Sequence, residues 1–167
     1  MAKFLTLTDK CNLRCSFCYE IPIDGSPHTF EAEPETFAPE LYKAMHDEGW
    51  KEVVITGGEP TMMPTFFRAI AECHRQGYEK IIVASNGRRF AYPDFTRRAR
   101  LAGLTHANIS LFGHNRIIHD GTTKQRGSFE QTNEGIRNLL AAGINVSCSV
   151  VVNKRNYKEL SPYMDHV

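Results

Sequence analysis

The chain has 167 residues, of which 41% are hydrophobic and 23% charged, so it is long and apolar enough to bury the core of one domain. Its 20 basic and 19 acidic residues leave a formal net charge of +1, which gives no electrostatic reason to expect nucleic acid or an anionic membrane as a partner. No stretch approaches the roughly 20 apolar residues of a transmembrane helix, and Met1 leads into a strand-like segment instead of a signal peptide. We therefore expect a cytoplasmic protein.

Glycines mark the start of four strand-like segments, at 49–56, 77–84, 103–110 and 143–150. Each glycine follows a stretch of helical apolar spacing, so we expect it to close that helix in the left-handed conformation. In chain order, the predicted elements are a strand at 3–7, helices at about 39–48, 64–76, 92–102 and 128–142 that alternate with the four segments, and a last helix starting near Asn156. Ser128, followed three residues on by Gln131, predicts a capping box.

Strand–helix alternation of this kind predicts an α/β fold, with a parallel sheet covered by helices. Five strand–helix units are too few for a closed eightfold barrel, so we expect an incomplete (β/α) TIM-like barrel, with a doubly wound open sheet as the alternative. We treat 1–167 as one domain, truncated at its C-terminal end. The long connections 8–38 and 111–127 leave strand C-terminal ends, where α/β proteins bind ligands.

Three of the five cysteines lie in one short loop directly after the first strand, at Cys11, Cys15 and Cys18. Thiolates are soft ligands that suit zinc or an iron–sulfur cluster, and a cluster with three protein thiolates leaves one iron open. A structural zinc site would need a fourth ligand, for which His28 is the nearest candidate. Cys73 and Cys148 fit small buried hydrophobic residues better than ligands.

Polar and glycine residues end the next three strands and are predicted to meet at one edge of the sheet. The second strand runs into Thr56-Gly57-Gly58-Glu59-Pro60, where two glycines let the backbone approach a ligand. The third ends in Ser85-Asn86-Gly87 and the fourth in Ser110. His114 and His119, in the following loop, have the chemistry of acids or bases, but such loop histidines are more often exposed or structural.

The motif Cys11-Asn-Leu-Arg-Cys15-Ser-Phe-Cys18, with the aromatic Phe17 before its last cysteine, resembles the signature of the radical S-adenosylmethionine (SAM) superfamily. The glycine segment resembles the superfamily's GGEP motif. The loop 111–127 resembles the SxxGxxxxxHD…GSF stretch of its peptide- and metabolite-modifying, SPASM-like maturase branch.

The resemblance implies a [4Fe–4S] cluster held by the three cysteines, whose fourth iron is chelated by the methionine amino and carboxylate groups of SAM. It also implies a one-electron reductant such as flavodoxin or ferredoxin. Reductive cleavage of SAM would then give a 5′-deoxyadenosyl radical that abstracts hydrogen from an unidentified peptide or small metabolite.

The resemblance further assigns residues to SAM, although it identifies no catalytic residue. The segment that binds the methionine amino group matches Gly57, Gly58, Glu59 and Pro60. The residues expected beside the carboxylate and ribose are Ser85, Asn86 and Ser110, and those expected near the adenine are Val151 and Asn153. Lys124 is the first match, and Arg126 the second, for a basic partner of the carboxylate, although Gly121 stands where some members have arginine. A zinc-stabilised non-enzymatic domain and an inactive fragment of a larger radical SAM protein are the alternatives.

Overall fold

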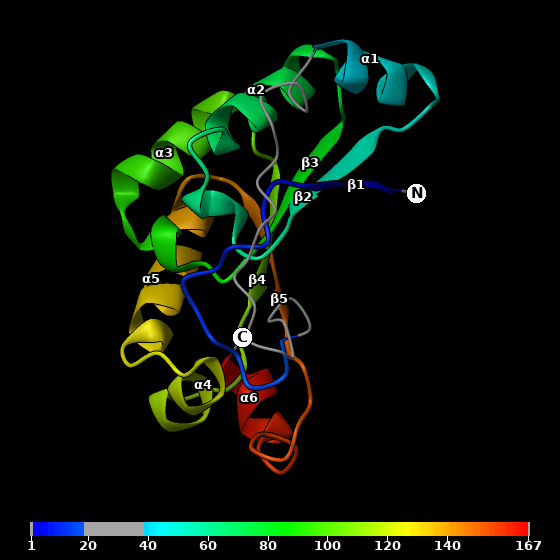
Figure 1. Ribbon diagram of the computed structural model, residues 1–167. Coiled ribbons are helices and arrows are strands. Elements are labelled where there is room, and N and C mark those ends of the chain that lie inside the picture. Colours follow the sequence, from blue (N-terminus) through cyan, green and yellow to red (C-terminus); the bar gives the residue numbers. More distant parts are fainter. Residues whose placement is uncertain (1, 19–38, 167) are drawn as a thin grey trace.

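The structure, a computed structural model, describes residues 2–18 and 39–166 (Figure 1). Its centre is a parallel sheet in which the strands pair in chain order, β1-β2-β3-β4-β5. The strands are β1 (Ala2–Thr6), β2 (Glu52–Thr56), β3 (Lys80–Ser85), β4 (His106–Ser110) and β5 (Asn145–Ser149). The helices are α1 (Pro39–Asp47), α2 (Phe66–Arg75), α3 (Pro93–Ala102), α4 (Arg116–Thr123), α5 (Ser128–Ala141) and α6 (Leu160–His166), with short 3-10 helices η2 (Pro60–Met62) and η3 (Arg88–Ala91).

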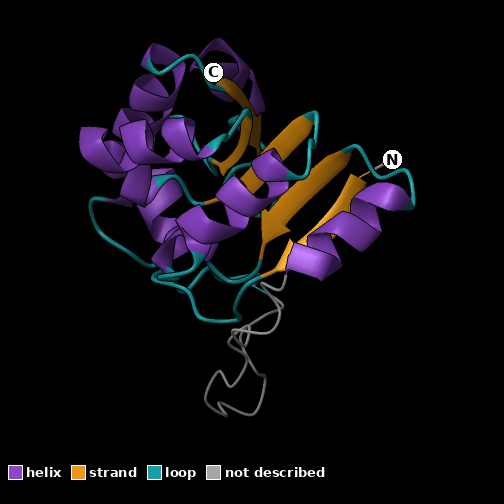
Figure 2. Cartoon of the chain, turned by 90° about the horizontal axis from the view of Figure 1, so that it is seen from above, coloured by secondary structure: helices purple, strands orange, loops and turns teal. Residues whose placement is uncertain are grey.

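The strand order confirms the predicted incomplete barrel. A doubly wound sheet would reverse its strand order near the middle, whereas this sheet adds each new strand beside the previous one. Figure 2 shows that the first and last strands, β1 and β5, do not meet, so the sheet stays open. Among the described residues, no helix is long and apolar enough to cross a membrane.

One face of the sheet packs against the helices and forms the core. A register row of apolar residues crosses the sheet on this face and is buried: Leu5, Ile55, Val83 and Ala107. Helices α2, α3 and α5 lie along this side in Figure 1. Three phenylalanines join the helix layer, with the rings of Phe66 and Phe95 stacked at 5.8 Å between centroids and Phe90 edge-on to both. The helices therefore cover one face of the sheet. The C-terminal ends of the strands lead into the loops that carry the motifs.

The glycine pattern is confirmed at each predicted helix end. Gly49, Gly77, Gly103 and Gly143 have φ values of 91°, 87°, 113° and 71°, in the left-handed region. These values explain why one residue type recurs before each strand, since a side chain is strained in this conformation.

The start of α5 differs from the prediction. The residue before the helix is Gly127, with φ 80°, and Ser128 is already its first helical residue. The cap comes from Asp120, whose carboxylate accepts hydrogen bonds from the Gly127 and Phe129 N–H groups at 2.7 and 2.9 Å and from the Ser128 hydroxyl at 2.8 Å. The predicted capping box is therefore wrong, because an acidic side chain from the preceding helix provides stronger acceptors than the Ser128 hydroxyl.

Two further predictions are corrected in the second half of the chain. The segment predicted as a loop at 111–127 contains the helix α4, whose Asn115 cap accepts the Ile118 N–H at 3.1 Å. The last helix begins at Leu160 and not near Asn156, because Asn156 is buried in the preceding turn, where its amide donates to the Phe112 and Val151 carbonyls.

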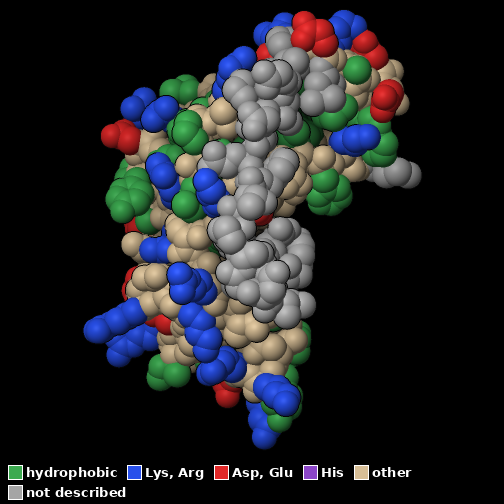
Figure 3. All heavy atoms as spheres, viewed as in Figure 1, with side chains coloured by type: hydrophobic (Ala, Val, Ile, Leu, Met, Phe, Trp, Pro, Cys, Tyr) green, Lys and Arg blue, Asp and Glu red, His purple; other side chains and the backbone are tan. Residues whose placement is uncertain are grey.

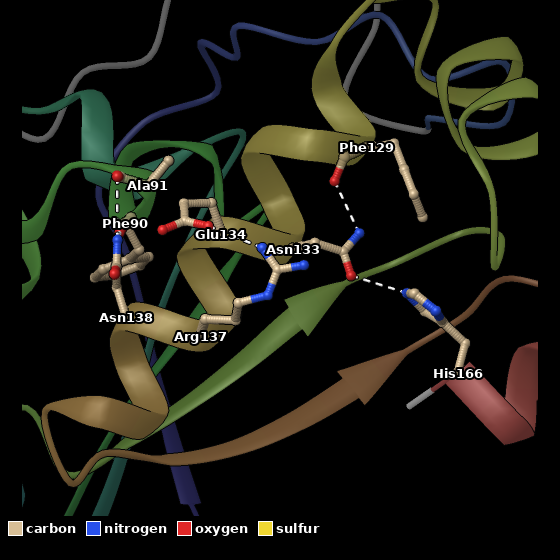
Figure 4. A network of polar contacts seen from close by, with 8 residues as sticks. All are labelled: Phe90, Ala91, Phe129, Asn133, Glu134, Arg137, Asn138 and His166. Atoms are coloured by element: carbon tan, nitrogen blue, oxygen red, sulfur yellow. Dashed lines mark hydrogen bonds and ion pairs between the residues drawn. The ribbon is translucent and has the colours of Figure 1, made fainter.

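Side-chain amides fasten the last helices to the rest of the fold (Figure 4). Asn133 of α5 donates to the Phe129 carbonyl at 2.8 Å, and its amide oxygen lies 2.8 Å from Nε2 of His166 in α6. One turn later, Asn138 donates to the carbonyls of Phe90 and Ala91 at 3.0 and 3.1 Å. These contacts tie α6 to α5 and α5 to the segment after β3.

Candidate functional site

A cavity of about 440 Å³ opens at the C-terminal ends of the strands. Its lining combines the cysteine loop with the ends or exits of β2, β3, β4 and β5, and consists of Cys11, Leu13, Cys15, Phe17, Cys18, Thr56, Gly57, Gly58, Ala84, Ser85, Asn86, Ser110, Phe112 and Val151. The fold thus brings the three cysteines together with most of the predicted SAM-binding residues.

The other predicted residues lie outside this lining. Glu59 is buried behind it, and Pro60 begins η2. Asn153 bonds to the nearby Val151 carbonyl at 3.0 Å. Lys124 is exposed at the C-terminal cap of α4, with a left-handed φ of 58°, and Arg126 is also exposed.

Backbone hydrogen bonds from α4 hold the cysteine loop. The Arg14 N–H donates to the Thr123 carbonyl at 3.1 Å, and the Ser16 N–H donates to the Thr122 carbonyl at 3.0 Å. Both carbonyls belong to the last turn of α4, where helical carbonyls lack partners within the helix. The helix missed by the sequence prediction is therefore the element that positions Cys15, which lies between the two donors.

The two glycines after β2 let this segment pack directly against the start of the cysteine loop. A Cβ at Gly57 would lie 2.2 Å from the Thr8 carbonyl oxygen, and one at Gly58 would lie 2.3 Å from that of Asp9. The Gly58 and Glu59 N–H groups donate to the Thr8 and Lys10 carbonyls at 2.7 and 2.8 Å. Because a Cβ at either position would collide with the protein's own backbone, both positions require glycine.

Glu59, which is buried and does not line the cavity, links the exits of β2 and β3. One carboxylate oxygen accepts from the Thr61 N–H and hydroxyl and from the Ser85 hydroxyl, and the other accepts from the Asn86 N–H at 2.8 Å. Burial raises the pKa of Glu59, although these hydrogen bonds oppose that effect. Its contacts make Glu59 a positioning residue for Ser85 and Asn86.

A polar network missed by the sequence prediction extends from Asn86 to α5. The Asn86 amide donates to the Asn12 side chain at 2.7 Å, and Nη1 of Arg88 donates to the Asn12 carbonyl at 2.9 Å. Nε of Arg88 donates to Gln131 at 2.6 Å. The only sequence signal for this network is the position of Asn12 inside the cysteine motif. The network attaches the loop to η3 and, through Gln131, to α5.

The cysteine thiols match the chemistry of an iron–sulfur ligand set. Burial raises the pKa of Cys11 to about 11 and that of Cys15 to about 12, and the neighbouring thiols raise both further. Each thiol must lose its proton to ligate iron, and a cationic metal centre stabilises the thiolates that form.

A single zinc ion is the alternative occupant of the cysteine loop. Zinc–sulfur bonds are about 2.3 Å long, so a zinc site needs closely grouped ligands. Within 2–18 and 39–166, no three His, Cys, Asp or Glu side chains are grouped to hold one metal ion. The proposed fourth zinc ligand, His28, lies outside the described residues. The other cysteines differ in burial, since Cys73 is buried as predicted and Cys148 is half-buried.

An aromatic stack closes one side of the cavity. The Phe17 ring meets that of Phe112 edge-on at 5.0 Å, and Phe112 stacks on His119 at 5.8 Å. Nδ1 of His119 accepts the Phe112 N–H at 3.1 Å, and burial lowers the pKa of this histidine to about 4. His119 is thus neutral and positions Phe112. His114 contacts the neighbouring Asn115 amide at 2.9 Å.

The curated relatives of the chain are similar to it over nearly its whole length. A "Probable GTP 3',8-cyclase" of Saccharolobus solfataricus is 30% identical over 164 residues, covering 96% of this chain and 51% of the relative. A "GTP 3',8-cyclase" of Petrotoga mobilis is 33% identical over 168 residues, covering 96% and 50%. The chain therefore spans about half the length of the curated relatives it matches.

Solved structures share the fold at low sequence identity. "Native anSMEcpe with bound AdoMet" has a TM-score of 0.78 at 14% identity, over 99% of this chain and 48% of that one. Streptococcus suis SuiB, "bound to precursor peptide SuiA", has a TM-score of 0.81 at 16% identity, over 99% and 36%. Residues 5–167 also match the sequence model of the "Radical SAM superfamily". This chain therefore belongs to the radical SAM superfamily of enzymes, whose cofactors are a [4Fe–4S] cluster and S-adenosylmethionine.

Proposed function

We propose that Cys11, Cys15 and Cys18 hold a [4Fe–4S] cluster, that SAM occupies the cavity beside them, and that the chain is the core of an enzyme that cleaves SAM reductively. The observation that carries the proposal is the shared cavity, in which three thiols of one loop face the glycine segment and the other strand exits. Its volume of about 440 Å³ lies within the usual range of small-ligand sites.

The cavity lining offers different chemistry to different parts of SAM. The backbone at Gly57 and Gly58 is suited to the methionine amino group, and the Asn86 amide and Ser110 hydroxyl to the carboxylate and ribose. Val151 offers an apolar surface for the adenine. We retain Pro60 and Asn153 as predicted neighbours of the ligand, and Lys124 as a predicted partner of the carboxylate.

A cluster held by the three cysteines would supply the electron for cleavage of the S–C5′ bond of SAM. The protein's part is to orient SAM and exclude water. Phe17 and Phe112 limit water on one side, while Glu59 keeps Ser85 and Asn86 in place without contacting the cavity itself.

We propose a small metabolite as the substrate. The names of the curated relatives support this class, because GTP is a small molecule. A peptide substrate, and with it the SPASM-like branch, stays a prediction. Incubation of the reconstituted protein with GTP or with peptides, followed by mass spectrometry of the products, separates the two classes.

The cofactor proposal is tested by anaerobic reconstitution. We expect about four iron and four sulfide per chain, and release of 5′-deoxyadenosine when SAM and dithionite are added. Replacing any one of Cys11, Cys15 or Cys18 with alanine should abolish both signals. Cys73→Ala is the matched control, because this cysteine is buried on α2 away from the cavity. Stoichiometric zinc without iron, or SAM cleavage that survives a loop cysteine replacement, would contradict the proposal.

A further inference from the structure

The sheet face opposite the helices, which we call the inner face, borders the cavity at the strand ends. Successive side chains of a strand point to opposite faces, so Thr56, which follows the buried Ile55, lies on the inner face. Ser110 follows the buried Ile109 in the same way. Both Thr56 and Ser110 line the cavity. A molecule in the cavity therefore meets the inner face of the sheet.

Two polar residues of the inner face, Asn108 and Ser149, lie directly beside residues that line the cavity. Ser149 of β5 is the register partner of Ser110, and Asn108 of β4 is the register partner of Ala84. Register partners on neighbouring strands share a face and lie about 5 Å apart. Ser149 is exposed and Asn108 is half-buried, so both are within reach of a ligand that extends from the cavity over the sheet.

A hydrogen bond between these two side chains orients them. The Ser149 hydroxyl donates to the amide oxygen of Asn108. Within 2–18 and 39–166, the two N–H groups of the Asn108 amide have no hydrogen-bond partner. The Ser149 oxygen keeps its capacity to accept, because its own proton is directed at Asn108. The pair therefore presents a donor and an acceptor side by side.

The inner face is neutral next to the cavity. Among the described strand residues, its charged side chains are Glu52 and Lys80, which lie at the N-terminal ends of β2 and β3 and form an ion pair at 2.6 Å. Figure 3 shows Lys and Arg side chains gathered elsewhere, over α5 and α4. Ionised ligand groups bind best to opposite charges, whereas amides and hydroxyls suit neutral groups that donate and accept. The described inner face therefore favours a neutral polar ligand.

We propose that Asn108 and Ser149 determine substrate specificity by hydrogen bonding to a neutral, hydroxyl-bearing group of the substrate, as in a sugar ring. A hydroxyl oxygen accepts from the Asn108 N–H while its proton is donated to the Ser149 oxygen, so one such group satisfies both partners. This inference rests on the proposed function, because it specifies the chemistry of the small metabolite that meets SAM in the cavity. The competing occupant is the ribose of SAM itself.

Equilibrium dialysis of the reconstituted chain, with SAM and without reductant, tests the pair. The probe is guanosine, which presents sugar hydroxyls without phosphate. We expect Asn108→Ala to weaken guanosine binding about fivefold and Ser149→Ala about threefold, with SAM affinity changed by less than about twofold. Because Ser149 is exposed, its replacement tests the pair even if Asn108→Ala does not fold. Asn145→Ala is the matched control, since this inner-face asparagine lies at the other end of β5 and donates to the Thr105 carbonyl.

Two analogues identify the recognised group. The wild-type chain should bind 2′,3′-dideoxyguanosine about tenfold more weakly than guanosine, because the analogue lacks both hydroxyls of the sugar ring. Free D-ribose distinguishes the sources of the group. Tighter binding of guanosine than of ribose indicates a nucleoside, and equal or tighter binding of ribose indicates a free sugar.

Three results would overturn the inference: guanosine affinity unchanged in both variants, equal affinity for the dideoxy analogue, or no measurable binding of guanosine and ribose by the wild type. An equal loss of SAM affinity would also overturn it, because the pair would then bind the SAM ribose. If the wild type cleaves SAM but guanosine binding is independent of Asn108, the inference alone fails. If no iron–sulfur cluster forms but guanosine binding depends on Asn108, the proposed function fails while the ligand site stands.

Discussion

His119 provides a test of the structure that depends on pH alone. Its ring is 1% exposed, and Nδ1 accepts the Phe112 N–H, so the neutral ring carries its proton on Nε2. Burial lowers its pKa from 6.5 to about 4, although the Asp120 carboxylate opposes this effect. Protonation of Nδ1 would place two N–H groups against each other. Protonation of His119 therefore destabilises the folded state.

The sign and size of the effect follow from the two pKa values. The unfolded chain takes up a proton near pH 6.5, and the folded chain does so only near pH 4. Between these values the unfolded state binds more protons. The contribution of the neutral His119 to the free energy of unfolding is therefore fully present above pH 6.5 and is lost as the pH drops. At about 1.4 kcal/mol per pKa unit, the loss approaches about 3 kcal/mol at pH 4.

His119→Asn isolates this contribution, because the asparagine oxygen can still accept the Phe112 N–H but does not titrate. Urea unfolding from about pH 7.5 to about pH 4.5 should show the wild-type chain losing roughly 2–3 kcal/mol more stability than the variant. His74→Asn, at an exposed position on α2, should follow the wild type. Parallel pH profiles for His119→Asn and the wild type would refute the assignment of a buried neutral histidine.

Three other substitutions test how the site is positioned. Gly57→Ala places a Cβ against a backbone oxygen at a positive φ and should cost at least about 3 kcal/mol in thermal unfolding, whereas Gly49→Ala, with no atom within 4 Å, should cost about 1 kcal/mol. Asp120→Ala removes the cap of α5 and should cost about 1–2 kcal/mol, while Asp94→Ala, at an exposed ion pair, should cost less than about 0.5 kcal/mol. Glu59→Gln directs an amide at buried donors and should reduce SAM affinity in equilibrium dialysis at least fivefold; unchanged affinity would exclude its positioning role.

The sequence is informative about the sheet because local chemistry determines its pattern. Each helix end needs a residue that tolerates a positive φ, so Gly49, Gly77, Gly103 and Gly143 mark the unit boundaries directly. The predicted helix bounds over 64–76, 92–102 and 128–142 differ from those of α2, α3 and α5 by at most two residues at either end. Strands that follow one another in the chain usually pair as neighbours, and the observed strand order agrees with this tendency.

The helix α4 is hidden because its stability comes from tertiary contacts and not from its composition. Its sequence, Arg-Ile-Ile-His-Asp-Gly-Thr-Thr, contains β-branched residues and a glycine, which are weak helix formers. The side chain of Asn115 starts the helix, and burial of His119 and Thr122 holds it against the fold. Because the sequence does not reveal α4, it also does not reveal that Asp120 of this helix caps α5.

The candidate site shows which residues a sequence motif can and cannot reveal. Cysteines and paired glycines are recognisable because ligand chemistry or close backbone approach demands that residue type. By contrast, the cysteine loop is held by the carbonyls of Thr122 and Thr123, and any residue type supplies a carbonyl. The motif therefore shows which side chains provide the chemistry of the site. Their positions are set by backbone groups more than one hundred residues away along the chain. Only the fold brings these groups into contact with the motif.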